Sequence, residues 1–187
     1  LSVYNVGFQN CDPLYQWGPG IRDHYLIHYI ISGKGFYKLR NKTFSLSAGD
    51  AFLVYPNTEV LYYADETEPW EYAWVGFTGS DASMILKATD FTMEHPVIHQ
   101  TASGNAIHRQ LLHIYDARGN EFEHAVEMTG RLYTMLAMFM HDASKQTSQN
   151  TSSTYVQKGI EYISANYSYN ITVEDIAPAL TGLQTTV

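Results

Sequence analysis

Short strand-like runs separated by turn residues dominate the first part of the chain and restrict its fold more than any other feature. The clearest run, residues 25–31 (YLIHYII), is apolar and rich in β-branched residues, and it ends at the turn signal SGKG of residues 32–35. Further short runs lie at 36–39, 43–46, 51–55, 60–64 and 71–77. Runs that recur about every 8 to 12 residues are typical of an antiparallel sandwich or barrel rather than of βαβ units. Residues 1–79 are therefore predicted to be β structure.

The hydrophobic period becomes helical after residue 79. Ser80 and Asp81 form a good helix start, and a second helical pattern covers residues 105–117. The strongest pattern covers residues 121–143, where an apolar stripe is formed by Phe122, Ala125, Val126, Leu132, Tyr133, Leu136, Phe139 and Met140. Beside this stripe, a second apolar face is formed by Met128, Met135 and Met138. A helix with so wide an apolar surface needs two partners, which we predict to be the β structure and a second copy of the chain.

A polar tract at residues 144–154 (SKQTSQNTSST) interrupts the helical pattern. It cannot form a core, so it is predicted to be a flexible linker between a domain at 1–143 and a second segment at 155–187. In that segment the helical pattern resumes at Tyr155, and Thr172 is predicted to cap a further helix. Because the chain begins at Leu1 and stops without a tail, we expect a fragment or an engineered segment of a longer protein.

Charge and cysteine content exclude several classes of protein. Eleven Lys and Arg against nineteen Asp and Glu give a net charge of −8, the wrong sign for a chain that binds nucleic acid by itself. The single cysteine, Cys11, cannot form an internal disulfide, and no stretch approaches the roughly 20 apolar residues of a membrane span. With no secretory leader at the N-terminus, we predict a cytoplasmic protein without a membrane partner.

The sequence offers little for metal or nucleophilic chemistry. His24 and His28 lie four positions apart on a predicted strand, about 13 Å along it, too far for one metal ion to bind both. The chain has no Gly-x-Ser-x-Gly, P-loop or Gly-x-Gly-x-x-Gly motif, and the acidic neighbour of Cys11 would raise its pKa and reduce its reactivity. An acidic cluster between two predicted strands, Asp65, Glu66, Glu68 and Glu71, is interpreted as a solvated turn. We predict no catalytic residue, no metal and no cofactor.

Aromatic side chains concentrate on the later predicted strands. Alternation places Trp70, Tyr72 and Trp74 on one strand face, with Tyr62 on the preceding strand, and no Lys or Arg occurs from residue 43 to 86. Arg22 and His24 add polar groups from a neighbouring strand. An apolar wall with hydroxyl and indole donors suits a neutral polar molecule such as a sugar, whose C–H faces pack on indole. The alternative is that these rings only fill the core.

Several segments, taken in order, resemble the AraC/XylS family of bacterial transcription regulators. They are residues 22–31 (RDHYLIHYII), 32–35 (SGKG), 46–50 (LSAGD) followed by 55–56 (YP), and 69–77 (PWEYAWVGF). Residues 155–177 resemble the opening of the family's DNA-binding domain. The resemblance implies a mainly β fold with C-terminal helices: a cupin-like antiparallel β-barrel or jelly roll, followed by two or three helices of which one is a long dimerisation helix.

The resemblance also implies which residues bind an effector inside the barrel. Trp74 corresponds to the Trp on which the sugar stacks in sugar-responsive members, and Tyr72 stands where some members have a His. Tyr62 corresponds to a Tyr of the pocket and Arg22 to its Arg, whereas Val60 stands where a pocket His can occur. The predicted ligand-binding residues are Arg22, His24, His28, Tyr62, Tyr72 and Trp74.

These inferences predict the ligand-sensing and dimerisation part of a sugar-responsive transcription regulator. Its expected partners are a mono- or oligosaccharide effector and a second copy of the chain. Residues 155–187 carry one Lys against three acidic residues, so operator DNA is expected to bind only through a C-terminal domain that this chain lacks. Sugar binding is expected to shift the docking of an N-terminal arm, residues 1–17, or of the dimer helices.

Two other functions remain open from the sequence. One is a cupin-type enzyme, an isomerase or a metal-dependent oxygenase, which would need two or three inward-facing metal ligands that meet at one point. The other is a dimerisation module whose barrel is filled and binds no ligand.

Overall fold

The computed structural model describes residues 1–143 and, beyond them, residues 159–160, 162–164, 166, 169, 171–173 and 175–176. The chain divides into two compact units, Leu1–Lys145 and Gln146–Val187. The predicted linker at 144–154 and the helix start at Tyr155 lie outside the described residues.

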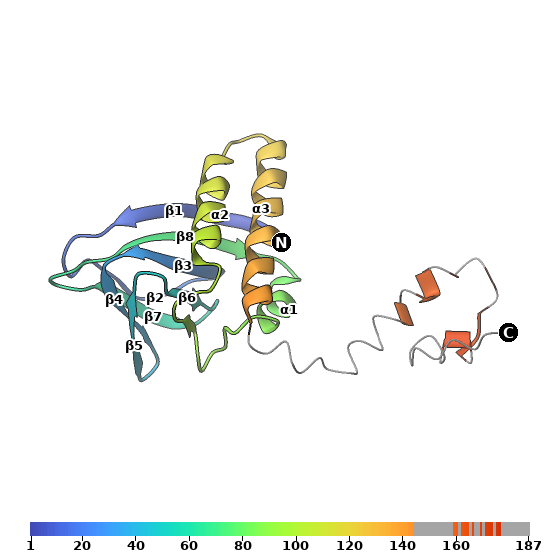
Figure 1. Cartoon of the computed structure of the whole chain (residues 1–187), viewed down its shortest axis with the longest axis horizontal. Coiled ribbons are helices and arrows are strands. Elements are labelled where there is room, and N and C mark those ends of the chain that lie inside the picture. The colour runs from blue at the N-terminus through green and yellow to red at the C-terminus, as the bar shows by residue number, and fades with distance from the viewer. Residues whose placement is uncertain are drawn as a thin grey trace. The chain divides into compact units, whose positions relative to one another are not determined.

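The first unit contains two antiparallel sheets that form a barrel (Figure 1). One sheet has the strand order β1 (Ser2–Asn10), β8 (Glu71–Thr78), β3 (Tyr25–Ser32), β6 (Ala51–Val54) and β9 (Val97–Ile98). The other has the order β2 (Gln16–Ile21), β7 (Glu59–Ala64), β4 (Lys34–Leu39) and β5 (Lys42–Ser47). The prediction of a mainly β, cupin-like barrel followed by helices is confirmed.

The first residues of the chain are part of the barrel rather than an arm that docks on it. Strand β1 pairs with β8 from Ser2 opposite Thr78 to Asn10 opposite Glu71, and β2 pairs with β7 so that Trp17 lies opposite Tyr62. A bulge between Val3 and Asn5 interrupts the register of β1. The expectation of an arm at residues 1–17 therefore has no counterpart in the structure.

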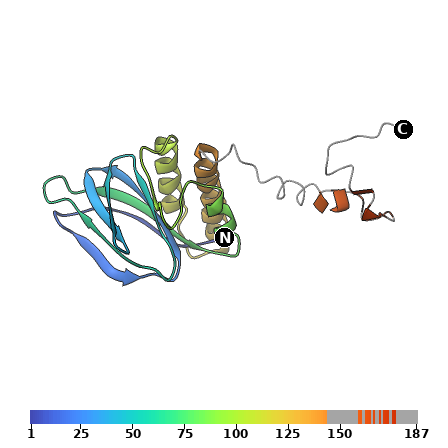
Figure 2. The ribbon, with the colours of Figure 1, turned by 90° about the horizontal axis from the view of Figure 1, so that it is seen from below.

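In the first unit, three helices follow β8: α1 (Ala82–Lys87), which precedes β9, and then α2 (Gly104–Asp116) and α3 (Phe122–Asp142). Helices α2 and α3 stand side by side against one side of the barrel (Figure 2). They bury apolar side chains against the five-stranded sheet, chiefly Ile27, Val75, Phe77, Ile107, Leu111, Leu132, Leu136 and Phe139. Each such side chain contributes about 1.5–3 kcal/mol relative to its exposed state, so the helices are an integral part of this domain.

The two apolar faces predicted for α3 are arranged differently in the structure. Met135 is fully buried, and Met128 and Met138 pack partly buried against the same core. Phe122 and Val126, which were predicted to belong to the packed stripe, are instead 82% and 55% exposed. The methionine face was therefore wrongly predicted to be free for a second copy: it faces the barrel, and the exposed apolar residues lie at the start of the helix.

A second core lies between the two sheets. Trp70 is completely buried and stacks on Phe52, with 6.0 Å between the ring centroids. Its indole lies so close to Gly35 that a Cβ there would come within 2.2 Å of the ring, so only glycine fits at this position. Tyr37 is also fully buried and donates a hydrogen bond to the Leu53 carbonyl at 3.2 Å. These residues belong to one cluster of buried side chains.

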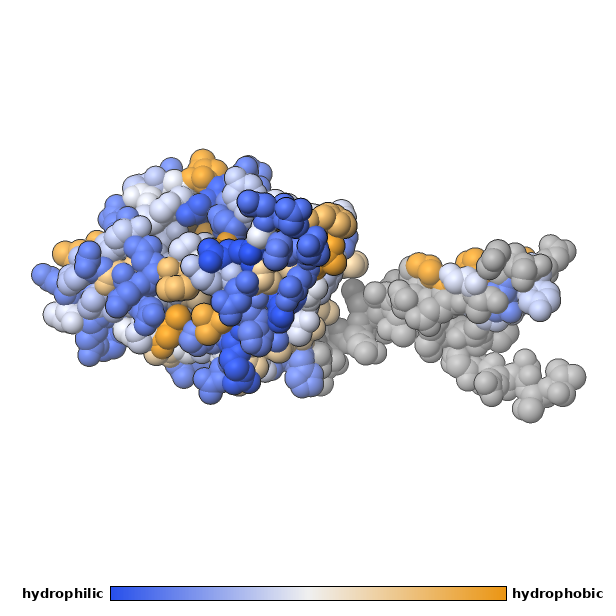
Figure 3. Space-filling view, turned by 90° about the horizontal axis from the view of Figure 1, so that it is seen from above, coloured by the Kyte–Doolittle hydropathy of each residue, from blue (hydrophilic) through white to orange (hydrophobic). Residues whose placement is uncertain are grey.

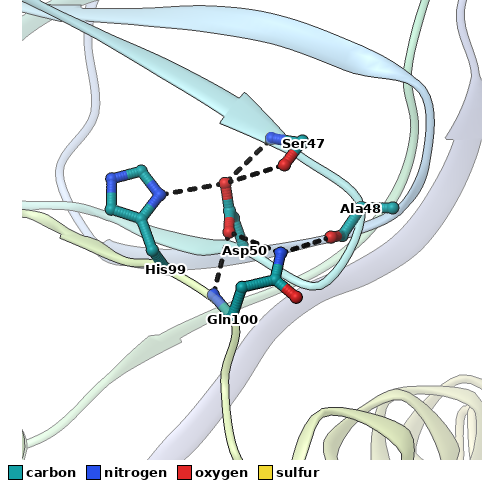
Figure 4. A network of polar contacts seen from close by, with 5 residues as sticks. All are labelled: Ser47, Ala48, Asp50, His99 and Gln100. Carbon is teal, nitrogen blue, oxygen red and sulfur yellow. Dashed lines mark hydrogen bonds and ion pairs between the residues drawn. The ribbon is translucent and has the colours of Figure 1, made fainter.

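Asp50 fixes the connection between the barrel and α2 (Figure 4). This carboxylate, only 2% exposed, accepts hydrogen bonds from the backbone N–H groups of Ser47 at 2.8 Å and of Gln100 at 2.9 Å. The Nδ1 atom of His99 lies 3.0 Å from its Oδ2 atom. Because these contacts satisfy the carboxylate within the protein, Asp50 serves to hold the turn before β6 against the segment that enters α2.

The described residues of the second unit include helical positions at 159–160, 162–164, 166, 173 and 175–176. The backbone N–H and the hydroxyl of Thr172 both donate to Oδ2 of Asp175, each at 2.8 Å. These bonds lower the pKa of Asp175, and they place Thr172 at the helix start where the sequence predicted a cap.

The surface of the molecule is mainly hydrophilic on the face shown in Figure 3, where hydrophobic side chains form small separate groups. Among the described residues, no helix is both long enough and apolar enough to cross a membrane.

Candidate functional site

A cavity of about 190 Å³ lies inside the barrel and takes its lining from both sheets. The lining residues are Asn5, Gln9, Tyr15, Trp17, Arg22, Leu26, His28, Tyr62, Tyr72 and Trp74. Five of the six predicted ligand-binding residues are in this set: Arg22, His28, Tyr62, Tyr72 and Trp74. The cavity thus brings together side chains from β1, β2, β3, β7 and β8.

His24 does not line the cavity. It precedes β3 and is only 4% exposed, with its ring stacked on Tyr4 at a centroid distance of 4.2 Å. Its Nδ1 atom lies 2.7 Å from a carboxylate oxygen of Asp23. The sequence predicted that His24 lies on the same strand as His28, but His24 lies before the first residue of β3, beside Gly76.

His28 forms part of the floor of the cavity. It is 1% exposed and stacks on Phe52 with 4.3 Å between ring centroids, while Tyr72 meets it edge-on at 4.9 Å. Burial lowers the pKa of His28 well below its ordinary value, and the positive charge of Arg22 lowers it further. The imidazole is therefore neutral and presents one donor and one acceptor, although its Nδ1 atom has no hydrogen-bond partner in the protein.

Arg22 and Trp17 form the more exposed side of the cavity. The guanidinium of Arg22 lies 4.0 Å above the Trp17 ring and donates a hydrogen bond to the Tyr62 hydroxyl at 3.3 Å. Trp17 in turn stacks on Tyr62, its cross-strand partner, at 5.2 Å. The Nε atom of Arg22 is buried without a partner, and no lining residue is acidic.

Trp74 forms an apolar wall of the cavity and is only partly buried. Its cross-strand partners are His28 on β3 and Gly7 on β1. A Cβ at Gly7 would lie 2.4 Å from the indole. The Trp74 ring can therefore occupy this position only because residue 7 has no side chain. Trp70, directly before β8, contributes to the core instead of the cavity.

Sequence analysis did not identify Asn5, Gln9, Tyr15, Trp17 and Leu26 as lining residues. Two of them, Asn5 and Gln9, have a recognisable pattern: with Gly7 between them they alternate along β1, which directs them to one face. The Tyr72 hydroxyl donates a long hydrogen bond to the Oε1 atom of Gln9 at 3.5 Å. Burial raises the pKa of Tyr72, so its phenol stays protonated. The cavity is therefore lined by neutral polar groups, aromatic rings and one cation.

Metal ligation has no candidate in the described part of the chain, where no group of three or more His, Cys, Asp or Glu side chains is arranged around one point. Cys11 is buried beside Tyr72 and Trp70, and burial raises its pKa.

The barrel matches a known protein family. The family model described as the AraC-like ligand-binding domain matches residues 2–136, which include every residue that lines the cavity. The chain belongs to the AraC-like ligand-binding domain family. The family resemblance inferred from the sequence is thereby confirmed.

The relatives that this chain matches include operon regulatory proteins, one of them the regulator of a raffinose operon. The chain is 34% identical over 185 residues to the Msm operon regulatory protein of Streptococcus mutans serotype c, covering 96% of this chain and 66% of that protein. It is 28% identical over 183 residues to the raffinose operon transcriptional regulatory protein RafR of Pediococcus pentosaceus, covering 94% of this chain and 65% of that protein. The chain thus spans just under two thirds of the length of these relatives.

Among solved structures, the AraC-like transcriptional activator CuxR is similar over 86% of this chain and 57% of that chain, with 14% identity and a TM-score of 0.45.

Proposed function

We propose that this chain is the ligand-sensing and dimerisation part of a cytoplasmic, sugar-responsive transcription regulator. The observation that carries the proposal is the barrel cavity, in which two tryptophans, Trp17 and Trp74, lie beside polar groups from four further side chains: Asn5, Gln9, Arg22 and His28. The raffinose operon in the name of one relative supports the same class of effector. Operator DNA would be bound by a further domain, outside residues 1–187.

The chemistry of the lining suits a sugar. An indole face packs against the C–H groups of a sugar ring, and hydroxyls both donate and accept hydrogen bonds. The neutral imidazole of His28 and the amide of Gln9 can do the same, whereas Arg22 only donates. The Nε atom of Arg22 and the Nδ1 atom of His28 have no protein partners, so a bound hydroxyl would satisfy groups that are otherwise costly to bury.

The lining gives less support to the two other functions. Of the ten lining residues, only His28 belongs to the usual metal-ligating types, so the cavity does not supply the ligand set that a cupin enzyme would need. A dimerisation module whose barrel is filled by its own side chains would leave no room for a ligand. The cavity of about 190 Å³ is not expected in such a barrel.

A second copy of the chain is the proposed partner of α3. Phe122 and Val126 are 82% and 55% exposed, and Tyr133, about two helical turns beyond Val126, is 39% exposed. Ala125 and Ala137 are exposed as well, and their small side chains allow two helices to approach closely. In a homodimer with a two-fold axis, this face of α3 would contact the same face of the second copy.

Sugar binding can be tested by tryptophan fluorescence and melting temperature with a panel of mono- and oligosaccharides. A sugar present at a hundred times its Kd stabilises the folded state by about 2.7 kcal/mol, which raises Tm by roughly 5–10 °C for a chain of this size. We expect Trp74→Ala to lose this response and Phe8→Ala, a change at an aromatic residue outside the cavity, to keep it. If no sugar changes either signal and Trp74→Ala behaves like the wild type, the proposal is wrong.

A further inference from the structure

Two buried polar atoms without hydrogen-bond partners lie close together beside the cavity. Asn5, which lines the cavity from β1, has its Oδ1 atom buried without a partner. The Nε2 atom of His24 is buried without a partner as well. A Cβ at Gly76 would lie 2.4 Å from Asn5 Oδ1 and 3.1 Å from His24 Nε2. The two side chains are therefore neighbours, and they can lie there only because residue 76 is a glycine.

The register of the strands brings these side chains together. Gly76 on β8 lies opposite Asn5 on β1 and opposite Leu26 on β3. His24 comes two residues before Leu26, and its ring is stacked on Tyr4 of β1 at a centroid distance of 4.2 Å. Because Asn5 lines the cavity and His24 does not, the imidazole would act on a bound ligand through Asn5.

The contact with Asp23 decides which nitrogen of His24 carries the proton. The Nδ1 atom lies 2.7 Å from a carboxylate oxygen of Asp23. The hydrogen bond from His24 lowers the pKa of Asp23, so this carboxylate is ionised and can only accept. The Nδ1 atom therefore donates, and the Nε2 atom of the neutral ring keeps its lone pair. Towards Asn5, the neutral imidazole is an acceptor and the protonated imidazole is a donor.

The side-chain amide of Asn5 can pair with either form of the ring. Its oxygen accepts and its nitrogen donates, and the two ends have nearly the same shape. A neutral His24 pairs with Nδ2 of Asn5, which leaves Oδ1 for the cavity. A protonated His24 pairs with Oδ1, the atom beside Gly76 in the structure, and leaves Nδ2 for the cavity. The charge of one histidine thus sets whether Asn5 offers a ligand an acceptor or a donor.

The cavity offers a sugar more donors than acceptors. Arg22 and the two indoles only donate, and no lining residue is acidic. The Oε1 atom of Gln9 already accepts from the Tyr72 hydroxyl. A sugar hydroxyl that accepts from one of the donors still needs an acceptor for its own hydrogen, and burying it unpaired is costly. An additional acceptor from Asn5 therefore favours binding.

We propose that His24 is a positioning residue of the sugar site. Its neutral imidazole accepts a hydrogen bond from Asn5 and holds the Asn5 carbonyl oxygen towards the cavity, and proton uptake by His24 turns the amide round and weakens sugar binding. This inference rests on the proposed function, because it adds a pH response to the same cavity.

The other titratable groups near His24 keep their charge between pH 6 and pH 8. They are the carboxylate of Asp23, the guanidinium of Arg22 and the phenol of Tyr4, and groups of these three kinds do not ordinarily titrate in that range. His28 stays neutral there, because burial lowers its pKa well below the ordinary value. A change of sugar affinity between pH 6 and pH 8 that originates at this end of the cavity therefore reports on His24.

NMR spectroscopy of the whole chain, labelled with ¹⁵N, tests the hydrogen bond without any ligand. At pH 8 we expect a proton on Nδ1 of His24 and a scalar coupling between Asn5 Nδ2 and His24 Nε2 across the hydrogen bond. The coupling should disappear as Nε2 takes up a proton. Spectra of Asn5→Ala and His24→Gln assign the signals. A neutral His24 with its proton on Nε2, or no coupling at pH 8, would overturn the inference and leave the proposed function standing.

Isothermal titration calorimetry at pH 8 and pH 6 tests the effect on binding, with galactose, lactose and raffinose as the probes. In the wild type, the Kd of a sugar that binds should be about three- to tenfold higher at pH 6, because one net hydrogen bond is lost. His24→Gln can still accept from Asn5 but does not titrate, so its Kd should change less than about twofold. The control is His113→Gln, at an exposed position on α2 outside the cavity, and it should respond to pH like the wild type.

The results separate this inference from the proposed function. If Kd changes equally with pH in the wild type and in His24→Gln, or does not change in the wild type, His24 does not position Asn5 for the sugar, while the sugar sensor stands. If none of the three sugars binds at pH 8 and none of a wider panel shifts the melting temperature, the proposed function fails and the inference falls with it.

Discussion

At the scale of single residues, the cavity depends on side chains whose places are decided by partners far away in the sequence. Tyr72 and Trp74 share a face of β8, as alternation predicts, and Trp70, directly before the strand, contacts the Tyr72 ring. Which of them reaches the cavity depends on Gly35 and Phe52 beside Trp70 and on Gly7 beside Trp74. These cross-strand neighbours are not local in sequence, so spacing alone could not separate the core tryptophan from the one that lines the cavity.

Tyr62 and Tyr63 offer a matched pair of substitutions on β7. Tyr62 faces the cavity and accepts the hydrogen bond from Arg22, whereas Tyr63 faces away from it and stacks on Phe36. Tyr62→Phe should weaken sugar binding about three- to tenfold, because one net hydrogen bond contributes about 0.5–1.5 kcal/mol. Tyr63→Phe should leave the Kd unchanged in the same titration. Equal effects of the two changes would contradict the assignment of the cavity as the binding site.

His28 makes a prediction about stability and pH. Its pKa in the folded state is lowered well below the ordinary value of about 6.5, so the unfolded chain takes up a proton first as the pH falls. Below pH 6.5 the free energy of unfolding should therefore decrease, by about 1.4 kcal/mol for each pH unit until the folded pKa is reached.

The contribution of His28 can be isolated with His28→Gln, which does not titrate. Urea unfolding of both proteins from pH 7.5 to 5 should show a steeper loss of stability in the wild type than in the variant. Parallel curves for the two proteins would mean that His28 is not buried as a neutral imidazole.

At the scale of secondary structure, the strands between residues 25 and 78 and the helices were predictable, and the first two strands were not individually recognised. Strand β1 carries Asn5 and Gln9 on its inward face because that face lines a polar cavity. The usual alternation of apolar and polar residues is thereby lost, and the segment has the composition of a loop. The helical spacing of apolar residues correctly predicted that α3 is amphipathic. It did not predict which of the two apolar faces packs on the barrel, because Met135, which is buried, and Val126, which is exposed, are equally hydrophobic candidates for the core.

The exposed start of α3 makes a prediction about association. Val126→Glu places a charge on the proposed dimer stripe and should raise the dimer dissociation constant at least about tenfold, because an unpaired charge cannot be buried cheaply. Sedimentation equilibrium measures this directly. Ile21→Glu on β2, where the side chain is 62% exposed, is the matched control and should not change association. A wild-type chain that is monomeric at tens of micromolar would contradict the proposed dimer.

At the scale of the whole molecule, the barrel and the helices share one core, so the cavity and the proposed dimer surface belong to one body. β1 lines the cavity with Asn5 and Gln9 and packs Val6 towards the core that holds Leu132 and Leu136 of α3. A ligand that orders β1 would therefore act on a strand that also supports α3. The sequence predicted both ligand sensing and dimerisation. It assigned residues 1–17 to a movable arm, whereas in the structure β1 is a strand of the barrel.

The most direct measurement is a crystal structure of the chain grown with the sugar that gives the largest rise in melting temperature. The account predicts density for one sugar ring inside the barrel, with a face against Trp74 and hydroxyls within hydrogen-bond distance of His28 and Arg22. A sugar bound elsewhere on the protein, with the barrel cavity free of it, would contradict the account.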